Sequence, residues 1–262
     1  MDKDDHQQMD KDLSKWLKKL STNKKSKKHH ASHYHQASQS ELMQRAARCY
    51  ALAGWNEDAC RMFVQLGDDR HAAAYFEKLG QYQRAGECYS RVAEWLNAAR
   101  CFMQCHLKDQ AASCYDKAGD RIQASWLWAH DVHHYQKALA LVSQIEATSD
   151  TDRLFVQLIQ ARCDAGTARH SHAAKKLHQC IAQLESMPPD MHQHQAYDWC
   201  MAIAQHLNRP DLMALIHATA LTCHRPNAQK NWETWAKDVL GDCQAVQLIQ
   251  NKAEKKPLPQ NN

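Results

Sequence analysis

Histidine and cysteine are the side chains of this sequence best suited to chemistry, and the chain contains 18 His and 11 Cys among its 262 residues. His130 and His134 are four residues apart, with His133 between them, so a helix would bring two imidazoles to one face. Metalloproteases bind zinc with such a pair when a Glu follows the first His, but Asp131 stands there in this chain. No third ligand is evident, and we expect a solvated or partly buried helix face.

The cysteines lack the spacing of a metal site, since no Cys-x-x-Cys occurs in the chain. Four of them share one position of a repeat that other units fill with Met, Tyr or Leu, namely Cys49, Cys88, Cys101 and Cys114. Because Leu cannot replace a metal ligand, we interpret these thiols as small, buried, nonpolar side chains.

The glycines exclude two kinds of phosphate-binding loop. The 7 Gly are never closer than six residues, whereas Walker-type and dinucleotide-binding loops need clustered Gly. A Gly-x-Ser-x-Gly nucleophile motif is also absent. We therefore predict that the chain is not an enzyme and has no catalytic residues, no metal, no cofactor and no small-molecule substrate. One alternative is a cryptic metal-dependent enzyme that uses His130, His133 and His134.

A 13-residue repeat organises residues 46–128. An aromatic residue occurs in every unit, with an alanine four residues before it and another small residue directly after that alanine. The aromatic residues are Tyr50, Phe63, Phe76, Tyr89, Phe102, Tyr115 and Trp128, and the alanines are Ala46, Ala59, Ala72, Ala85, Ala98, Ala111 and Ala124. Together with apolar residues at neighbouring helical positions, they form one stripe of an α-helix. The small residues would let adjacent backbones approach, and the aromatic ring would fill the gap between them.

Each repeat unit is predicted to be a short helix followed by a turn. Gly54, Gly67, Gly80 and Gly119 follow the stripe where a left-handed residue would end the helix. A helix of about ten residues is too short to be stable alone in water, so it must pack on its neighbours. We expect an eighth unit in a shifted register, with Ala138 and Val142 on its buried side.

The spacing of the repeat resembles a known architecture. The series Gly54, Ala59, Phe63 and Leu66 looks like the second helix of a tetratricopeptide repeat, although both helices of each hairpin carry the pattern here. The resulting 26-residue hairpin is similar to the compact helical repeats of clathrin legs and vesicle-coat proteins. The resemblance covers residues 46–145 and implies scaffolding or peptide binding.

The predicted fold is therefore all-α, an antiparallel helical-hairpin solenoid with longer hairpins toward the C-terminus. We divide the chain into a tail, 1–40, a short-helix array, 41–148, longer hairpins that continue or cap the solenoid, 149–250, and a polar tail, 251–262. The longer helices are predicted at residues 152–165, 170–186, 191–207, 210–223 and 228–240.

The N-terminal tail holds all of the formal net charge. Residues 1–40 carry nine Lys and five Asp, and the rest of the chain is electrically balanced. We expect this segment to be disordered, apart from a possible amphipathic helix at residues 9–20. Its histidines, His29, His30, His33 and His35, could take up transition metals adventitiously. An alternative function is thus a tether whose lysines bind nucleic acid or an anionic membrane surface.

The sequence also bears on the compartment and on the partner. The start of the chain lacks the apolar core of a signal peptide, no stretch could span a membrane, and the odd cysteine count favours reduced thiols, so we expect a cytoplasmic protein. We predict a scaffold or adaptor that binds a protein or peptide partner within a larger complex. Alternate helices should line its binding surface with residues outside the stripe: Leu52, Lys78, Arg100, Met103, Trp126 and His130.

Overall fold

The structure is a computed structural model that describes residues 31–240, with side chains described for residues 39–239. The predicted helix at residues 9–20 and the polar tail at 251–262 lie outside the described residues, as do His29 and His30. The side chains of His33 and His35 are also outside the described part.

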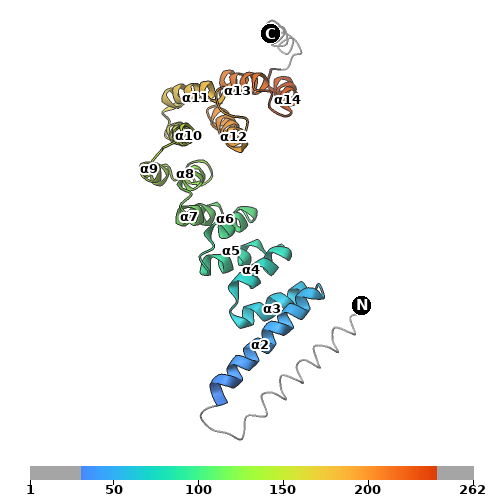
Figure 1. The fold of residues 1–262 in the computed structure, drawn as a ribbon. Coiled ribbons are helices and arrows are strands. Elements are labelled where there is room, and N and C mark those ends of the chain that lie inside the picture. Colours follow the sequence, from blue (N-terminus) through green and yellow to red (C-terminus); the bar gives the residue numbers. More distant parts are fainter. Residues whose placement is uncertain (1–30, 241–262) are drawn as a thin grey trace, which may run out of the picture. The chain divides into compact units, whose positions relative to one another are not determined.

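The described residues form an all-α solenoid of antiparallel helical hairpins, and no strand occurs between residues 31 and 240 (Figure 1). After the long first helix come short helices, and longer hairpins follow them, as the sequence predicted. The helices of this range are α2 (Ala31–Leu52), α3 (Asn56–Leu66), α4 (Asp69–Lys78), α5 (Tyr82–Arg91), α6 (Trp95–Gln104), α7 (Lys108–Lys117), α8 (Arg121–His130), α9 (Tyr135–Val142), α10 (Asp150–Gly166), α11 (His170–Leu184), α12 (Met191–His206), α13 (Pro210–Thr222) and α14 (Ala228–Leu240).

The chain divides into two compact units, with the boundary between Gln81 and Tyr82. In the first unit, α2 packs on α3 and α3 packs on α4. Helix α2 begins at Ala31 and so includes the last ten residues of the predicted tail, 1–40, whereas the division of the chain into tail, array and hairpins stays a prediction. The pattern of the repeat starts only at residue 46, which is why it gave no signal for the earlier turns of this helix.

In the second unit, each helix from α5 to α9 packs on the next one along the chain. The longer helices have more neighbours, since α10 contacts α8, α9, α11 and α12, and α11 also contacts α13. The predicted helices of this part agree with α10–α14 to within two residues at each end. Helix α10 begins with a capping box, in which the Ser149 hydroxyl accepts from the Asp152 amide and the Asp152 carboxylate accepts from the Ser149 amide.

The predicted stripe is the core of the short helices. Its alanines from Ala59 to Ala124 are fully buried, and its aromatic residues are buried except for Tyr115, which is half-buried. Gly86, at the second small position of α5, lies so close to the Phe102 ring of α6 that an added Cβ would come within 2.8 Å of Cε1. The predicted packing of rings against small residues is thereby confirmed. The eighth unit is α9, with Ala138 and Val142 buried.

The turns between the short helices share one backbone conformation. A residue with positive φ occurs every 13 residues, at Gly54, Gly67, Gly80, Ala93, His106 and Gly119. Two of the short helices also have side-chain N-caps, because Asp68 accepts from the His71 amide and Asp120 from the Gln123 amide. The left-handed turn is therefore a feature of the repeat even where the sequence provides no glycine.

Among the described helices, none is both long enough and apolar enough to cross a membrane.

Candidate binding surfaces

Two of the residues predicted to bind a partner lie in the first unit. Leu52, the last residue of α2, is 90% exposed. Lys78 at the end of α4 is exposed, and its Nζ lies 4.5 Å from the centroid of the Tyr75 ring. Both side chains are accessible, as expected, and their role in binding stays a prediction.

Arg100 and Met103 lie on α6 of the second unit. Arg100 is exposed and donates a hydrogen bond to Asn97. Met103 is half-buried, with its Sδ 3.9 Å from Lys108 Nζ. Leu96, one helical turn before Arg100, is 52% exposed. These three residues follow helical spacing and give α6 an accessible, partly apolar face.

The expectation of an accessible Trp126 is wrong. Its side chain is only 6% exposed and stacks on Trp199 of α12, with the ring centroids 4.1 Å apart and the planes 4° from parallel. Phe155 of α10 meets the same Trp199 ring edge-on at 4.9 Å. The longer helices thus cover a face of α8 that its counterparts in the short-helix array leave open, and Trp126 belongs to the core.

The three histidines singled out for chemistry lie in different surroundings. His130 ends α8 and stacks on Trp126, whereas His134 stacks on Trp128. His133 lies between them in a left-handed conformation, with φ 60°. Within residues 39–239, no group of three or more His, Cys, Asp or Glu side chains is arranged to hold a metal ion.

What His130 and His133 share is a buried arginine. Arg162 of α10 is only 1% exposed. Its Nε donates to His130 Nδ1 at 3.3 Å, and its Nη2 lies 3.5 Å from both the His130 carbonyl oxygen and His133 Nδ1. Its Nη1 is buried without a hydrogen-bond partner. No carboxylate of the described residues lies within 4.0 Å of this guanidinium.

Sequence reasoning missed Arg162, although a signal for its burial was present. Leu154, Leu158 and Arg162 follow one another at intervals of four residues, so Arg162 lies on the buried face of its helix. The sequence could not supply its neighbours, because His130 and His133 are about 30 positions away.

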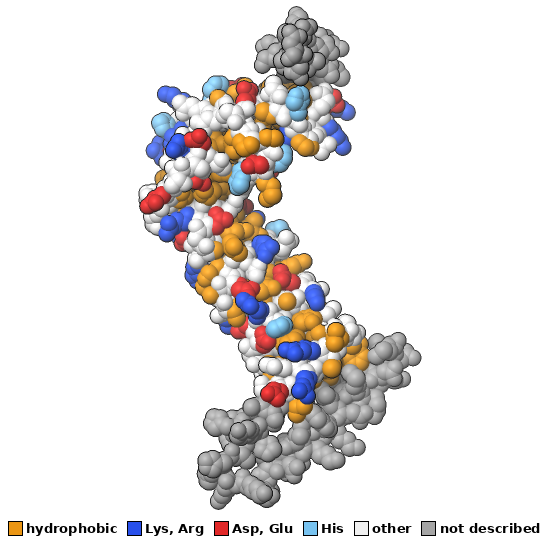
Figure 2. All heavy atoms as spheres, viewed as in Figure 1, with side chains coloured by type: hydrophobic (Ala, Val, Ile, Leu, Met, Phe, Trp, Pro, Cys, Tyr) orange, Lys and Arg blue, Asp and Glu red, His pale blue; other side chains and the backbone are white. Residues whose placement is uncertain are grey.

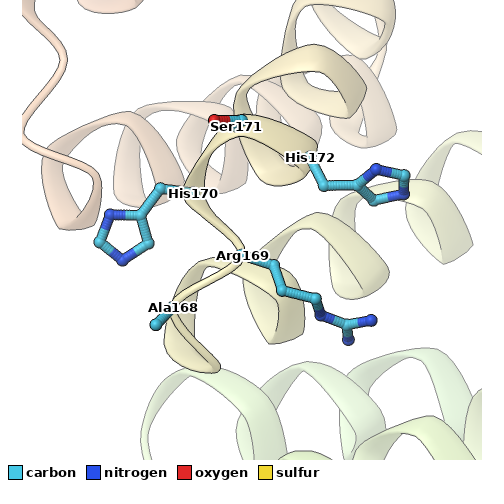
Figure 3. A pocket seen from close by; sticks show the side chains of 5 residues that line it. All are labelled: Ala168, Arg169, His170, Ser171 and His172. Atoms are coloured by element: carbon cyan, nitrogen blue, oxygen red, sulfur yellow. The ribbon is translucent and has the colours of Figure 1, made fainter.

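A second buried charge on α10 has basic side chains beside it. The Asp164 carboxylate is 2.7 Å from Arg169 Nη2, 2.9 Å from Lys176 Nζ and 4.0 Å from His172 Nε2. Figure 3 shows Arg169 and His172 directed to one side of the chain and His170 to the other. They line a shallow depression of about 330 Å³ at the start of α11. Because Arg169 already forms an ion pair with Asp164, this depression offers little unpaired positive charge to a ligand.

A larger groove of about 420 Å³ lies between α12, α13 and α14. Its apolar lining includes Met201, Met213, Ile216 and Ala220. An ion pair of 2.9 Å between Arg225 Nη2 and Asp198 Oδ1 lies among the polar residues that border it. The groove therefore combines a flexible apolar lining with a polar edge.

His217 lines the same groove and is itself buried. Burial, and then the positive charge of Arg225, lowers the pKa of the His217 imidazole. Its ring centroid is 5.3 Å from that of Trp235 and 5.8 Å from that of Trp232 on α14. His217 is thus a neutral, packed side chain of the groove wall at pH 7.

Comparison with known proteins gives no family and no relative, because no family model, no curated protein and no solved structure matches the chain.

Proposed function

We propose that this chain is a non-catalytic scaffold or adaptor that binds a protein or peptide partner in the groove between α12, α13 and α14. The observation that carries the proposal is the composition of this groove, with apolar side chains at its wall and an ion pair at its edge. Peptides bind such grooves by burying apolar side chains and forming polar contacts at the rim. The two methionines suit this role, because their unbranched side chains adapt to the shape of a ligand.

The repeat architecture supports the same proposal. Solenoids of stacked helical hairpins offer a long surface relative to their length, and the similarity to tetratricopeptide and clathrin-type repeats favours a binding role. The face of α6 formed by Leu96, Arg100 and Met103 is a second candidate surface. Helix α6 is one of the alternate helices predicted from the sequence to bind a partner. The buried Trp126 of α8 is not part of this second surface.

We further propose that the protein works in the cytoplasm. All cysteines of the described range are free thiols, as expected for a reducing compartment. The alternative of a tether that binds nucleic acid or acidic lipid depends on the lysines of the N-terminal tail, outside the described residues. Its test is a chain without residues 1–30, which should lose such binding in low salt.

The groove is tested by affinity capture followed by a direct binding measurement with the captured protein. Met213→Asp would bury a carboxylate against the apolar wall, so partner affinity should fall at least about tenfold. Met191→Asp is the matched control, because Met191 is 84% exposed and does not line the groove. Circular dichroism should show that both variants keep the wild-type helix content.

The outcome distinguishes the two surfaces. Loss of binding in Met213→Asp alone supports the groove between α12 and α14. If Leu96→Asp loses affinity for the partner and Met213→Asp binds it normally, the binding site lies on α6. Wild-type affinity in all three variants would contradict both surfaces.

A further inference from the structure

The hydrogen bonds of Arg162 determine the tautomers of two histidines. A guanidinium can only donate hydrogen bonds. His130 Nδ1, at 3.3 Å from Arg162 Nε, must therefore accept, and so must His133 Nδ1, at 3.5 Å from Nη2. Each ring then carries its proton on Nε2. Both imidazoles are neutral in this arrangement, because a doubly protonated ring would have no acceptor for the guanidinium.

The polar groups left over in this cluster are all donors. They are the N–H groups of Arg162 Nη1, which have no partner, and the Nε2–H groups of His130 and His133. The guanidinium faces the Tyr135 ring, with Cζ 5.8 Å from the ring centroid. The hydrogen bonds that Arg162 makes, at 3.3–3.5 Å, are long compared with the value of about 2.8 Å for a charged hydrogen bond to an anion. The cluster is therefore short of acceptors and of negative charge.

The C-terminus of α12 adds a neutral imidazole rather than a carboxylate. Burial, followed by the positive charge of Arg162, lowers the pKa of His206 at this end of the helix. Asp131 is the acidic neighbour that acts on His130, and its carboxylate already pairs with Lys108 at 3.8 Å. A buried guanidinium without a carboxylate is costly, so a counter-ion from outside would be bound favourably.

The cluster is open to such an ion on its histidine side. His133 is exposed and His130 is half-buried, whereas Arg162, which donates to both, is only 1% exposed. Histidine side chains recur on the face of α10–α14 drawn in Figure 2. An anion there would accept from imidazole N–H groups, while the guanidinium would act on it from the low-dielectric interior.

We propose that Arg162, His130 and His133 form a binding site for a small oxyanion, a phosphate or carboxylate group. The proposal goes beyond partner binding in the groove, because the site lies on other side chains and needs no protein partner to be occupied. Its ligand is either a free oxyanion or an acidic side chain of another molecule, and both present the acceptor oxygens that the cluster lacks.

The test is titration of the full-length protein with inorganic phosphate at pH 7, followed by calorimetry and by NMR of the imidazole nitrogens. Phosphate should bind saturably and shift the resonances of His130 and His133. Arg162→Gln should weaken binding at least tenfold. Because this buried substitution could impair folding, His133→Ala provides a second measurement on an exposed residue, with a severalfold loss expected.

Two controls separate the site from general positive charge. Arg225→Gln removes a guanidinium that is already paired with Asp198, and His178→Ala removes an exposed histidine of α11. Both should bind phosphate like the wild type. Equal binding by the wild type and His133→Ala would mean an adventitious ion only and would overturn the proposal.

A second titration, with N-acetylglutamate amide, identifies the source of the oxyanion. Stronger binding of this carboxylate than of phosphate points to an acidic side chain of a partner. Stronger binding of phosphate points to a free phosphate or a phosphate ester. If neither compound binds at millimolar concentration, the site does not exist. Normal partner binding by His133→Ala would leave the proposed groove intact, so the two proposals can fail separately.

Discussion

At the scale of single residues, two histidines in the second unit should make its stability depend on pH. Burial is the main cause that lowers the pKa of His130 and of His217 below the ordinary value of 6.5, and positive neighbours add to it. A lowered pKa means that the unfolded chain binds more protons than the folded chain between the two values. The free energy of unfolding should therefore be highest above pH 6.5. It should decrease as the pH falls below 6.5 and through the folded-state pKa values of the two histidines.

The prediction is measured as the melting temperature between pH 7.5 and pH 5.5, in the wild type and in His217→Phe. Phe fills the space between Trp232 and Trp235 but cannot be protonated, so the variant should lose less stability on acidification. The exposed His178 provides the control substitution, His178→Phe, which should leave the wild-type slope unchanged. An equal slope in His217→Phe would show that this imidazole is not responsible.

The residues that sequence reasoning misjudged have their important neighbours far along the chain. Trp126 lies off the repeat stripe, and only its contacts with Trp199 and Phe155 explain its burial. Arg162 similarly depends on His130 and His133. A helical pattern predicts which face of a helix is apolar, but it does not predict which later helix will cover another face.

At the scale of elements, the left-handed turn of the repeat offers a direct test. Ala93 and His106 have φ near 60°, where a side chain costs about 1–2 kcal/mol, and four equivalent turns have glycine. Because glycine also increases the entropy of the unfolded chain, Ala93→Gly and His106→Gly should each raise the free energy of unfolding by about 0.5–1 kcal/mol. Urea denaturation followed by circular dichroism measures this change.

The reverse substitution completes the comparison. Gly119 has φ 85°, and no atom lies within 4 Å of an added Cβ, so Gly119→Ala adds strain without a steric contact. It should lower the free energy of unfolding by about 1 kcal/mol. A neutral effect of all three substitutions would mean that these turns relax without cost.

The close approach of α5 and α6 at Gly86 makes a different prediction. Alanine favours a helix over glycine by about 1 kcal/mol, but its Cβ would lie 2.8 Å from a Phe102 ring that is 4% exposed and has little room to move. Overpacking of this kind costs about 1–3 kcal/mol, so Gly86→Ala should be destabilising overall.

The cause can be checked with a second substitution. Phe102→Leu removes the opposing ring, and Gly86→Ala should then be neutral or stabilising in that background. Glu87→Ala, at the exposed neighbouring position, is the control, because it replaces a residue of the same helix without adding a contact to the Phe102 ring. Destabilisation by Gly86→Ala that persists without the ring would rule out the steric explanation.

The helices of this chain were predictable because the packing rule is local and repeats. Alanine and an aromatic ring at fixed spacing identify the buried face of each short helix, and glycine identified several helix ends, such as that of α3 at Gly67. The turns at Ala93 and His106 gave no such signal, since neither residue prefers a left-handed backbone. Their conformation follows from the neighbouring units, which need the same turn to keep the helices packed.

At the scale of the whole molecule, the candidate binding surfaces were less predictable than the fold. The groove between α12, α13 and α14 arises where residues from three helices meet, and none of its lining residues belongs to the 13-residue pattern. On α6, by contrast, the positions that avoid the stripe proved accessible, as at Arg100. Surfaces made by one helix follow from its pattern, whereas surfaces shared by several helices depend on how those helices pack.

The difference between short and long helices should also govern how the second unit opens. Helices α5–α7 have about ten residues and pack mainly on the next helix, whereas α10 contacts four other helices. In a solenoid, the free energy of unfolding is approximately the sum of the stabilities of the individual repeats and of the contacts between neighbouring repeats. The short-helix region should therefore open with a smaller free energy than the region around α10.

Buried cysteines report this opening at positions along the unit. Cys88, Cys101 and Cys114 lie in the short helices, and Cys163, Cys180 and Cys200 lie in α10, α11 and α12. Burial raises the pKa of Cys163 to about 11 and of Cys180 to about 12, so these thiols should react only after local opening. With pulsed alkylation at pH 7 and peptide mass spectrometry, the first group should be labelled at least tenfold faster. A single rate for all six cysteines would mean that the unit opens as one cooperative block, and the additive description of the solenoid would then not apply to it.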